Sequence, residues 1–392
     1  MSAERRIYLD HNATAPLRPE AKEAFLYALD RCGNASSPHF EGRKARGLLD
    51  RARQAVADLC QSQSQDVIFT SGATEANALA LSPFLKLRRS DPRSFTRLLV
   101  LASEHPSVLF GHDFAHDAVT HLPVQPNGVI DQTQFAAVLK EWNDQSNAPL
   151  VSIQAANSET GVMQDIPALA AMVHAVGGLL HVDAVQAAGR VPLDQCCAGA
   201  DLLSLSAHKL GGPQGVGALV MLSGAVHFEK PLIRGGGQEQ GRRSGTENVA
   251  AIHAFGAACE AARHALPTEN LRLTQERDRL IDTLQRIDPQ MVVFGLDAPR
   301  LPNTVYFAPS FVEAQTALMR FDLAGVALSS GSACSSGKVK ESHVLQAMGV
   351  EPSLRKRAVR LSIGWSTTSE ELDHFCSLYE QDYQNQSGVR AA

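Results

Sequence analysis

Hydrophobic positions along the first half of the chain follow two different spacings. Apolar side chains recur every three to four residues in two early stretches, which predicts one helix from Pro19 to near Gly33 and a second from Ala45 to Leu59. Short, almost continuously apolar runs follow, and they predict strands at Val67–Thr70, Leu98–Ala102, Leu150–Gln154, Leu179–Asp183, Leu202–Ser206 and Ala218–Met221. Strands of this kind are typical of a mainly parallel sheet that helices cover on both faces.

The pattern changes after about residue 258. A polar helix is predicted over Thr268–Ile287, followed by strands at Pro302–Phe307 and Val359–Ile363 with helical stretches between them. We therefore predict an α/β protein with a large domain over residues 13–260. A smaller α+β domain is expected from residues 1–12 and 261–392.

Composition and charge argue against several classes of protein. The 392 residues carry 36 Lys and Arg against 41 Asp and Glu, a net charge of −5, which disfavours a nucleic-acid partner. No apolar stretch reaches the ~18 residues of a membrane helix, and the first residues lack the apolar core of a secretory signal. The seven cysteines form no C-x-x-C pair, so we expect a reducing, cytoplasmic setting and no metal site.

A lysine directly follows one of the predicted strands. The segment Ser204–Pro213 runs from an apolar strand through Ser206, His208 and Lys209 into glycines. Ligands bind at the carboxyl ends of strands in open α/β sheets, and a desolvated lysine there becomes a nucleophile that can form a Schiff base. A lysine in an exposed loop explains this segment alone equally well.

Three other predicted strands also end in polar residues. Asp183 could hold a protonated pyridine nitrogen, or it could cap a helix. Thr74 lies at a predicted helix start, where main-chain N–H groups and its hydroxyl could bind an anion or belong to a plain helix cap. His105 could stack on a planar ring, although a lone histidine is more often structural.

Predicted loops and a late strand supply the remaining candidates. Asn157 could bind a ligand or stabilise a turn, and the glycine-rich segment Arg234–Asn248 could approach a phosphate or a neighbouring subunit. Arg360 suits a bidentate grip on a carboxylate, or a surface ion pair. Cys334 lies among small residues, and a thiol in such a polar loop can ionise and attack.

Together these segments resemble the cysteine desulfurases of the NifS/IscS family, in family order and over nearly the whole chain. The matching segments are Tyr8–Thr14, Gly33–His39, Phe69–Asn77, Glu104–His105, Asn157–Gly161, His181–Gln186, Ser204–Gly217, Gly235–Asn248, Ser329–Gly337 and Val359–Gly364. The resemblance implies the aspartate-aminotransferase-like fold of pyridoxal 5'-phosphate enzymes (fold type I) and a homodimer.

The resemblance also implies roles for individual residues. Lys209 would bind the cofactor covalently, while Asp183 would pair with its pyridine nitrogen and Gln186 with its ring oxygen. His105 would stack on the ring as a catalytic residue, and Cys334 would receive the sulfur. The phosphate would be held by Thr74, Ser206, His208 and Thr246 of the partner subunit, and the substrate carboxylate by Asn34, Asn157 and Arg360.

These roles imply a cysteine desulfurase, which converts L-cysteine to L-alanine and leaves a persulfide on Cys334 for transfer to an acceptor protein. Iron–sulfur cluster assembly and thiolation are both compatible destinations. Two alternatives stay open: a selenocysteine lyase or another lyase or aminotransferase of this fold, and a non-catalytic scaffold partner. His11 and Trp365 depart from the residues that the family usually carries near the expected site.

Overall fold

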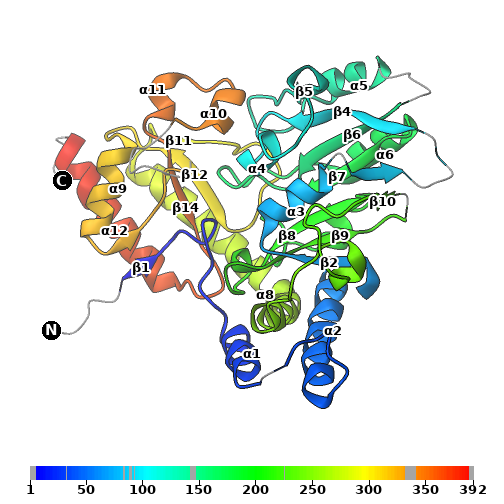
Figure 1. The fold of residues 1–392 in the computed structure, drawn as a ribbon. Helices are drawn as coiled ribbons and strands as arrows, with labels where there is room; N and C mark the ends of the chain where they lie inside the picture. Colours follow the sequence, from blue (N-terminus) through cyan, green and yellow to red (C-terminus); the bar gives the residue numbers. More distant parts are fainter. Residues whose placement is uncertain are drawn as a thin grey trace.

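The computed structural model describes residues 6–31, 33–82, 84–87, 91, 93–141, 147–224, 226–331 and 341–387. Its centre is a seven-stranded sheet with the order β2-β9-β8-β7-β6-β4-β5 (Figure 1). The strands of this sheet are β2 (Val67–Thr70), β4 (Ser94–Leu101), β5 (Val119–Leu122), β6 (Asn147–Gln154), β7 (Leu179–Asp183), β8 (Leu202–Ser206) and β9 (Gly217–Met221). The six strands predicted from apolar runs are therefore present, and β5 was not predicted.

The central sheet is mainly parallel. Strands β8, β7, β6, β4 and β5 pair in parallel, and β9 runs antiparallel to both β2 and β8. The register sets Asp183 opposite both Gln154 and Ser204 on the neighbouring strands. The carboxyl ends of β6, β7 and β8 consequently meet at one edge of the sheet, where open α/β sheets bind ligands.

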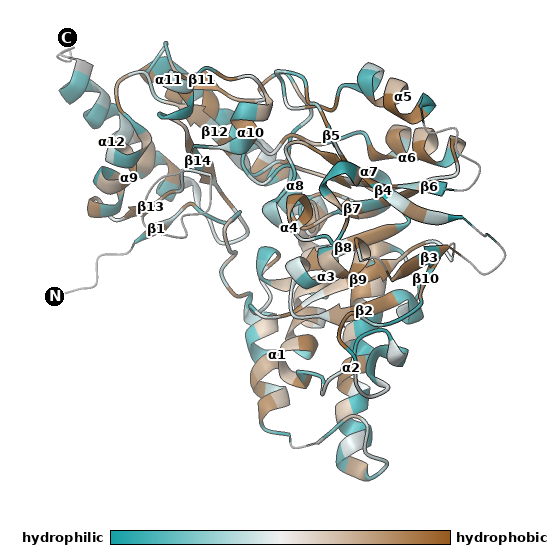
Figure 2. Cartoon of the chain, turned by 45° about the horizontal axis from the view of Figure 1, so that its top comes forward, coloured by the Kyte–Doolittle hydropathy of each residue, from teal (hydrophilic) through white to brown (hydrophobic). Residues whose placement is uncertain are grey.

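Both faces of this sheet are buried, as the continuous apolar runs predict. Successive residues of one strand pack into different cores: Leu180 and Leu203 belong to one cluster, and their neighbours Leu179 and Leu202 belong to another. Figure 2 shows the strands of this sheet largely in the hydrophobic colour, with helices around them that carry both hydrophilic and hydrophobic residues. The helices of this part are α1 (Pro19–Leu29), α2 (Phe40–Cys60), α3 (Ala73–Ala80), α4 (Pro106–Leu109), α5 (Gln132–Lys140), α6 (Ile166–Ala175) and α7 (Leu193–Cys196).

A second core lies around the antiparallel sheet β11-β12-β14. Its strands are β11 (Val292–Val293), β12 (Thr304–Ala308) and β14 (Val359–Ser362), and the helices that pack into it are α9 (Ala314–Leu323) and α12 (Ser369–Ser387). The short helices α10 (His343–Ala347) and α11 (Pro352–Arg355) pack instead against the core of the large sheet, through Val344, Leu345 and Leu354. The N-terminal strand β1 (Ile7–Tyr8) pairs in parallel with β13 (Val326–Ala327), and Ile7 and Leu9 pack into this second core. A separate antiparallel pair consists of β3 (Leu85–Leu87) and β10 (Val226–Phe228).

One long helix, α8 (Val249–Ile287), passes from the first core to the second. Its residues up to Ala262 pack into the core of the large sheet, and those from Leu273 onward pack into the second core. The predicted start at Thr268 was wrong, because the helix begins at Val249 and continues through Pro267. No helix among the described residues is long and apolar enough to cross a membrane.

Candidate active site

Lys209 lies in a short 3-10 turn, Ala207–Lys209, directly after β8. Its Nζ donates hydrogen bonds to the main-chain carbonyls of Asn12 at 2.6 Å and Ala13 at 2.8 Å. Desolvation lowers the pKa of this amine to about 7, and the positive charges of Arg360 and Arg190 act in the same direction. A large share of Lys209 is therefore neutral, and hence nucleophilic, near neutral pH.

Asp183, the last residue of β7, presents a buried carboxylate next to this turn. Its Oδ2 accepts a hydrogen bond from Nδ2 of Asn77 at 2.9 Å, and its Oδ1 accepts one from the main-chain N–H of Val185 at 3.0 Å. Both of these donors are neutral, and among the described residues no lysine or arginine forms an ion pair with this carboxylate. A buried carboxylate of this kind suits a cationic ligand atom, such as a protonated pyridine nitrogen.

His105 is fixed beside Asp183 through a chain of side-chain hydrogen bonds. Its Nδ1 lies 2.8 Å from Oγ of Ser107, which also accepts from Nδ2 of Asn77 at 2.9 Å. Desolvation lowers the pKa of His105, the charge of Asp183 opposes this, and that of Lys209 adds to it. His105 is exposed to solvent and its ring is held in place by these hydrogen bonds, which suits stacking on a planar ring.

The main-chain carbonyl of Asn12 joins two of the predicted cofactor residues. It accepts from Nζ of Lys209 at 2.6 Å and from Nε2 of Gln186 at 3.2 Å. His208, next to the lysine, has its Nδ1 3.1 Å from Oγ1 of Thr14. Desolvation and then the charge of Lys209 lower the pKa of His208 to about 4, so it is neutral at pH 7.

The start of α3 offers an anion-binding group. The residue before the helix, Gly72, provides no side-chain cap, and a Cβ built there would meet no heavy atom within 4 Å. Thr74, in the first turn, is exposed. Because the first N–H groups of a helix lack partners inside it, this end suits a phosphate. Ser206, the buried last residue of β8, completes the predicted group within this chain.

Arg360, on β14, is buried in an ion pair instead of lying on the surface. Its Nη2 donates to Oδ1 of Asp10 at 2.6 Å, and its Nη1 donates to the carbonyl of Ser158 at 2.9 Å. Its Nε is buried without a hydrogen-bond partner in the part of the chain that the structure describes. An unused guanidinium donor is consistent with an incoming carboxylate.

Asn157 supports the loop that carries Ser158. Its amide oxygen accepts from the main-chain N–H groups of Glu159 and Thr160, each at 2.9 Å, and its Nδ2 donates to the carbonyl of Ser103 at 3.0 Å. The side chain therefore stabilises a turn, which was the alternative interpretation of this residue. Through Ser158 it also helps to place Arg360.

Three predicted site residues are not brought into this cluster by any contact that the structure describes. Asn34 is exposed in the loop between α1 and α2, where its Oδ1 accepts from the N–H of Ser36 at 2.8 Å; this loop lies at the lower end of the view in Figure 1. Thr246 is exposed in the glycine-rich loop. Cys334 lies outside the described residues.

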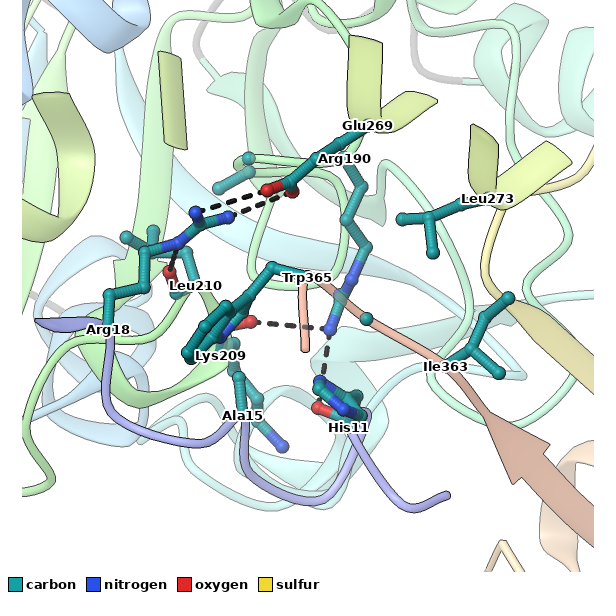
Figure 3. Close-up of a pocket in the computed structure, with 13 residues that line it drawn as sticks. His11, Ala15, Arg18, Arg190, Lys209, Leu210, Glu269, Leu273, Ile363 and Trp365 are labelled. Atoms are coloured by element: carbon teal, nitrogen blue, oxygen red, sulfur yellow. Dashed lines mark hydrogen bonds and ion pairs between the residues drawn. The ribbon is translucent and has the colours of Figure 1, made fainter. Parts of the chain in front are cut away.

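The two residues that depart from the family pattern pack beside the lysine turn. His11 leaves no room for a side chain at Gly364, where a Cβ would lie 2.0 Å from the histidine Nδ1. Trp365 donates from Nε1 to the carbonyl of Pro16 at 3.1 Å. Both line a cavity of about 30 Å³ together with Lys209, Arg18 and Arg190 (Figure 3).

Sequence reasoning did not identify Asn77, Asn12 or Arg190 as parts of the site. Asn77 lies one helical turn after Thr74, and Arg190 follows Gln186 by four residues within a run of small residues. That spacing, together with a polar residue in an otherwise apolar or small stretch, is the signal that could have identified Asn77 and Arg190.

The cluster as a whole fits pyridoxal 5'-phosphate. Four features lie around one sheet edge: a lysine of lowered pKa, a buried carboxylate with neutral donors, an exposed histidine and a helix start without a side-chain cap. Lys209, Asp183, Gln186 and His105 would hold the ring, and the start of α3 with Thr74 would hold the phosphate.

Comparison with known proteins agrees with this chemistry. Residues 7–375 match the family model described as aminotransferase class-V. The chain is 36% identical over 383 residues to the cysteine desulfurase IscS of Dictyoglomus turgidum, covering 96% of this chain and 94% of that protein. It is 40% identical over 374 residues to a cysteine desulfurase of Cereibacter sphaeroides, covering 94% and 93%.

Among solved structures, the chain resembles a NifS-like protein from Rickettsia africae. The TM-score is 0.85 at 32% sequence identity, and the match covers 97% of this chain and 99% of that one. Such extended similarity, in sequence and in structure, confirms the predicted fold type. The chain belongs to the aminotransferase class-V family, whose members use pyridoxal 5'-phosphate.

Proposed function

We propose that this protein is a cysteine desulfurase. The observation that carries the proposal is the Lys209 amine, which has a pKa of about 7 and is held by two main-chain carbonyls beside the buried Asp183. The relatives named above as cysteine desulfurases support L-cysteine as the substrate. The reaction would yield L-alanine and a persulfide on Cys334.

When bound, pyridoxal 5'-phosphate supplies an electron sink for negative charge that develops at the substrate Cα. The chain's own residues would prepare this site. Asp183, oriented by Asn77, would keep the pyridine nitrogen protonated. Lys209 would accept the Cα proton of the substrate, and the carbonyls of Asn12 and Ala13 would stabilise its charged form by accepting N–H bonds.

Arg360 would bind the substrate carboxylate and orient the amino acid. The thiolate of Cys334 would then attack the substrate sulfur. A sulfur–sulfur bond forms as the Cβ–sulfur bond breaks, and the carbon takes up a proton, so that alanine is released. Cys334 must first attack the substrate sulfur and later deliver that sulfur to an acceptor. The small residues on both sides of it in the sequence suit both steps, because they put little bulk around the thiol.

We also propose an oligomeric state, a class of sulfur acceptor and a cellular compartment for this reaction. The exposed Thr246 supports a homodimer in which this residue contacts the phosphate in the second subunit's site. The acceptor would be a protein of iron–sulfur cluster assembly or of thiolation, and the cysteine usage supports work in the reducing cytoplasm.

The proposal is tested by assaying alanine and sulfide from L-cysteine under reducing conditions. Wild type is expected to release the two in equal amounts, and C334A to bind cofactor normally but produce neither. C376A, which removes a half-buried thiol of α12, is the matched control and should keep full activity. Full desulfuration by C334A would overturn the mechanism, whereas activity on selenocysteine alone would favour a selenocysteine lyase.

A further inference from the structure

A buried arginine without an acidic partner lies next to the lysine turn. Arg190 is 7% exposed, and among the described residues no carboxylate forms an ion pair with it. Its Nη1 donates to the main-chain carbonyl of Gln186 at 2.7 Å and to Oε1 of the same residue at 2.6 Å. A buried charge that meets only neutral acceptors is costly, so its hydrogen bonds must offset that cost.

The other terminal nitrogen of Arg190 reaches two further segments. Its Nη2 lies 3.3 Å from the carbonyl of Lys209 and 3.4 Å from that of His11 (Figure 3). The main chain of Arg190 is held in turn, because its carbonyl accepts from Nδ2 of Asn270 on α8 at 2.7 Å. One guanidinium therefore joins the lysine turn, the Gln186 side chain and the N-terminal segment.

The same N-terminal segment holds the lysine amine. Asn12, which follows His11, accepts at its carbonyl from both Lys209 Nζ and Gln186 Nε2. A shift of this segment would therefore move the Asn12 carbonyl and, with it, the Lys209 amine that is bonded to it. Arg190 contacts the Gln186 side chain, the main chain of Lys209 and His11, the residue before Asn12.

Arg190 also adds positive charge close to that amine. Its charge disfavours the protonated form of Lys209, after the larger effects of desolvation and of Arg360. The charged and titratable groups that influence Lys209, or are influenced by it, are Arg360, Arg190, Asp10, Asp183, His105 and His208.

We propose that Arg190 is a positioning residue of this active site. It fixes Gln186 and the main chain of Lys209 against the segment that carries Asn12, and so presents a neutral lysine amine to the cofactor. The proposal rests on the proposed function in that it takes Lys209 as the cofactor lysine.

The test measures the protonation of Lys209 in the full chain freed of cofactor. Competitive labelling with acetic anhydride over a pH series, read by peptide mass spectrometry, gives the titration midpoint of this one amine. In R190M, which removes the charge and all donors, the midpoint should rise by about 0.5 to 1 pH unit because a neighbouring positive charge is lost. Affinity for pyridoxal 5'-phosphate, measured by absorbance titration, should fall about tenfold.

R190K separates charge from geometry. A lysine keeps the positive charge but cannot reproduce the planar fork of donors. The midpoint of Lys209 should therefore stay within about 0.3 pH units of wild type, while cofactor affinity falls several-fold. Unchanged cofactor affinity in R190K would overturn the proposal, and this arm stands even where R190M fails to fold.

R18M is the matched control. Arg18 lines the same cavity but donates to the carbonyl of Leu210 and to Glu269, and not to Gln186 or to the lysine main chain. In R18M the titration midpoint of Lys209 should equal that of the wild-type chain. A folded R190M with the wild-type midpoint would make Arg190 merely structural, and an equal shift in R18M would also contradict the specific role.

The two proposals fail in distinguishable ways. A wild-type chain that binds no cofactor at Lys209 overturns the proposed function. Normal binding at Lys209, combined with R190M and R190K chains that match wild type in both readouts, overturns only the role of Arg190.

Discussion

The ion pair between Asp10 and Arg360 predicts a competition with the substrate. The side chain of Arg360 is 5% exposed and that of Asp10 is 18% exposed, and their Nη2 and Oδ1 atoms lie 2.6 Å apart. A substrate carboxylate that binds Arg360 must draw a donor away from Asp10 or share the guanidinium with it. Asp10→Asn removes the competing charge and keeps an acceptor of the same shape.

The magnitude follows from the strength of the bond that is lost. A hydrogen bond to a charged group contributes about 1 to 1.5 kcal/mol more than a neutral one. The D10N variant should therefore bind an amino acid carboxylate about tenfold more tightly than wild type. In the absence of ligand it should be less stable by about 2 kcal/mol, because the buried Arg360 loses its counter-charge.

The assay is a titration of the holoenzyme with the reaction product L-alanine, followed by the visible absorbance of the cofactor. L-Alaninamide, which lacks the carboxylate, is the control ligand and should bind wild type and D10N equally. Urea denaturation checks the loss of stability. Weaker alanine binding in D10N, with unchanged binding of the amide, would refute the reasoning and make Asp10 an orienting partner of Arg360.

Three further predictions follow from single contacts. Asn77→Leu removes the amide that donates to Asp183, so the buried carboxylate loses a hydrogen bond worth about 1.4 kcal/mol. Cofactor affinity, measured by equilibrium titration, should fall about tenfold; unchanged affinity would count against this role of Asn77. Gly364→Ala places a Cβ 2.0 Å from Nδ1 of His11, so unfolding free energy should drop by about 1 to 3 kcal/mol in urea, and H11A in the same chain should restore part of it. Because only neutral Lys209 attacks, cofactor binding by the apoprotein should speed up as pH rises through about 7 and then level off; a rate independent of pH across this range contradicts the assignment.

The lowered pKa of Lys209 also affects stability, with a defined sign. The folded chain binds this proton more weakly than the unfolded chain, whose lysine has the ordinary pKa of 10.5. Folding should therefore become more favourable through this group as pH rises from about 7 toward 10.5, and its unfavourable contribution is complete below that window.

The central sheet could be predicted because its strands are buried on both faces. Val67–Thr70, Leu179–Asp183 and Leu202–Ser206 have the predicted bounds, since every position in them must be apolar or internally bonded. The strand β5 was missed because only Leu122 of its four residues is buried. The two-residue strands β1 and β13 depend on pairing between the two ends of the chain, which no local pattern reveals.

The candidate site also has one part that the sequence predicts and one part that it does not. Lys209, Asp183 and His105 follow strands, so their meeting at one sheet edge follows from a parallel topology. The bonds made by Asn77 and Arg190 depend on side-chain packing between segments 106 and 19 residues apart, and periodicity contains no such information. The family resemblance identified the chemistry, and the structure shows which neighbours hold it in place.

Sulfur transfer from L-cysteine to Cys334, with Lys209 as the cofactor lysine, can be observed on the protein itself. The holoenzyme is incubated with L-cysteine that carries a heavy sulfur isotope, and its peptides are mapped by mass spectrometry without reductant. We expect one heavy sulfur on the Cys334 peptide, with equimolar alanine, and loss of both in K209A. Alanine formation without heavy sulfur on Cys334, or heavy sulfur on another cysteine, would contradict this mechanism.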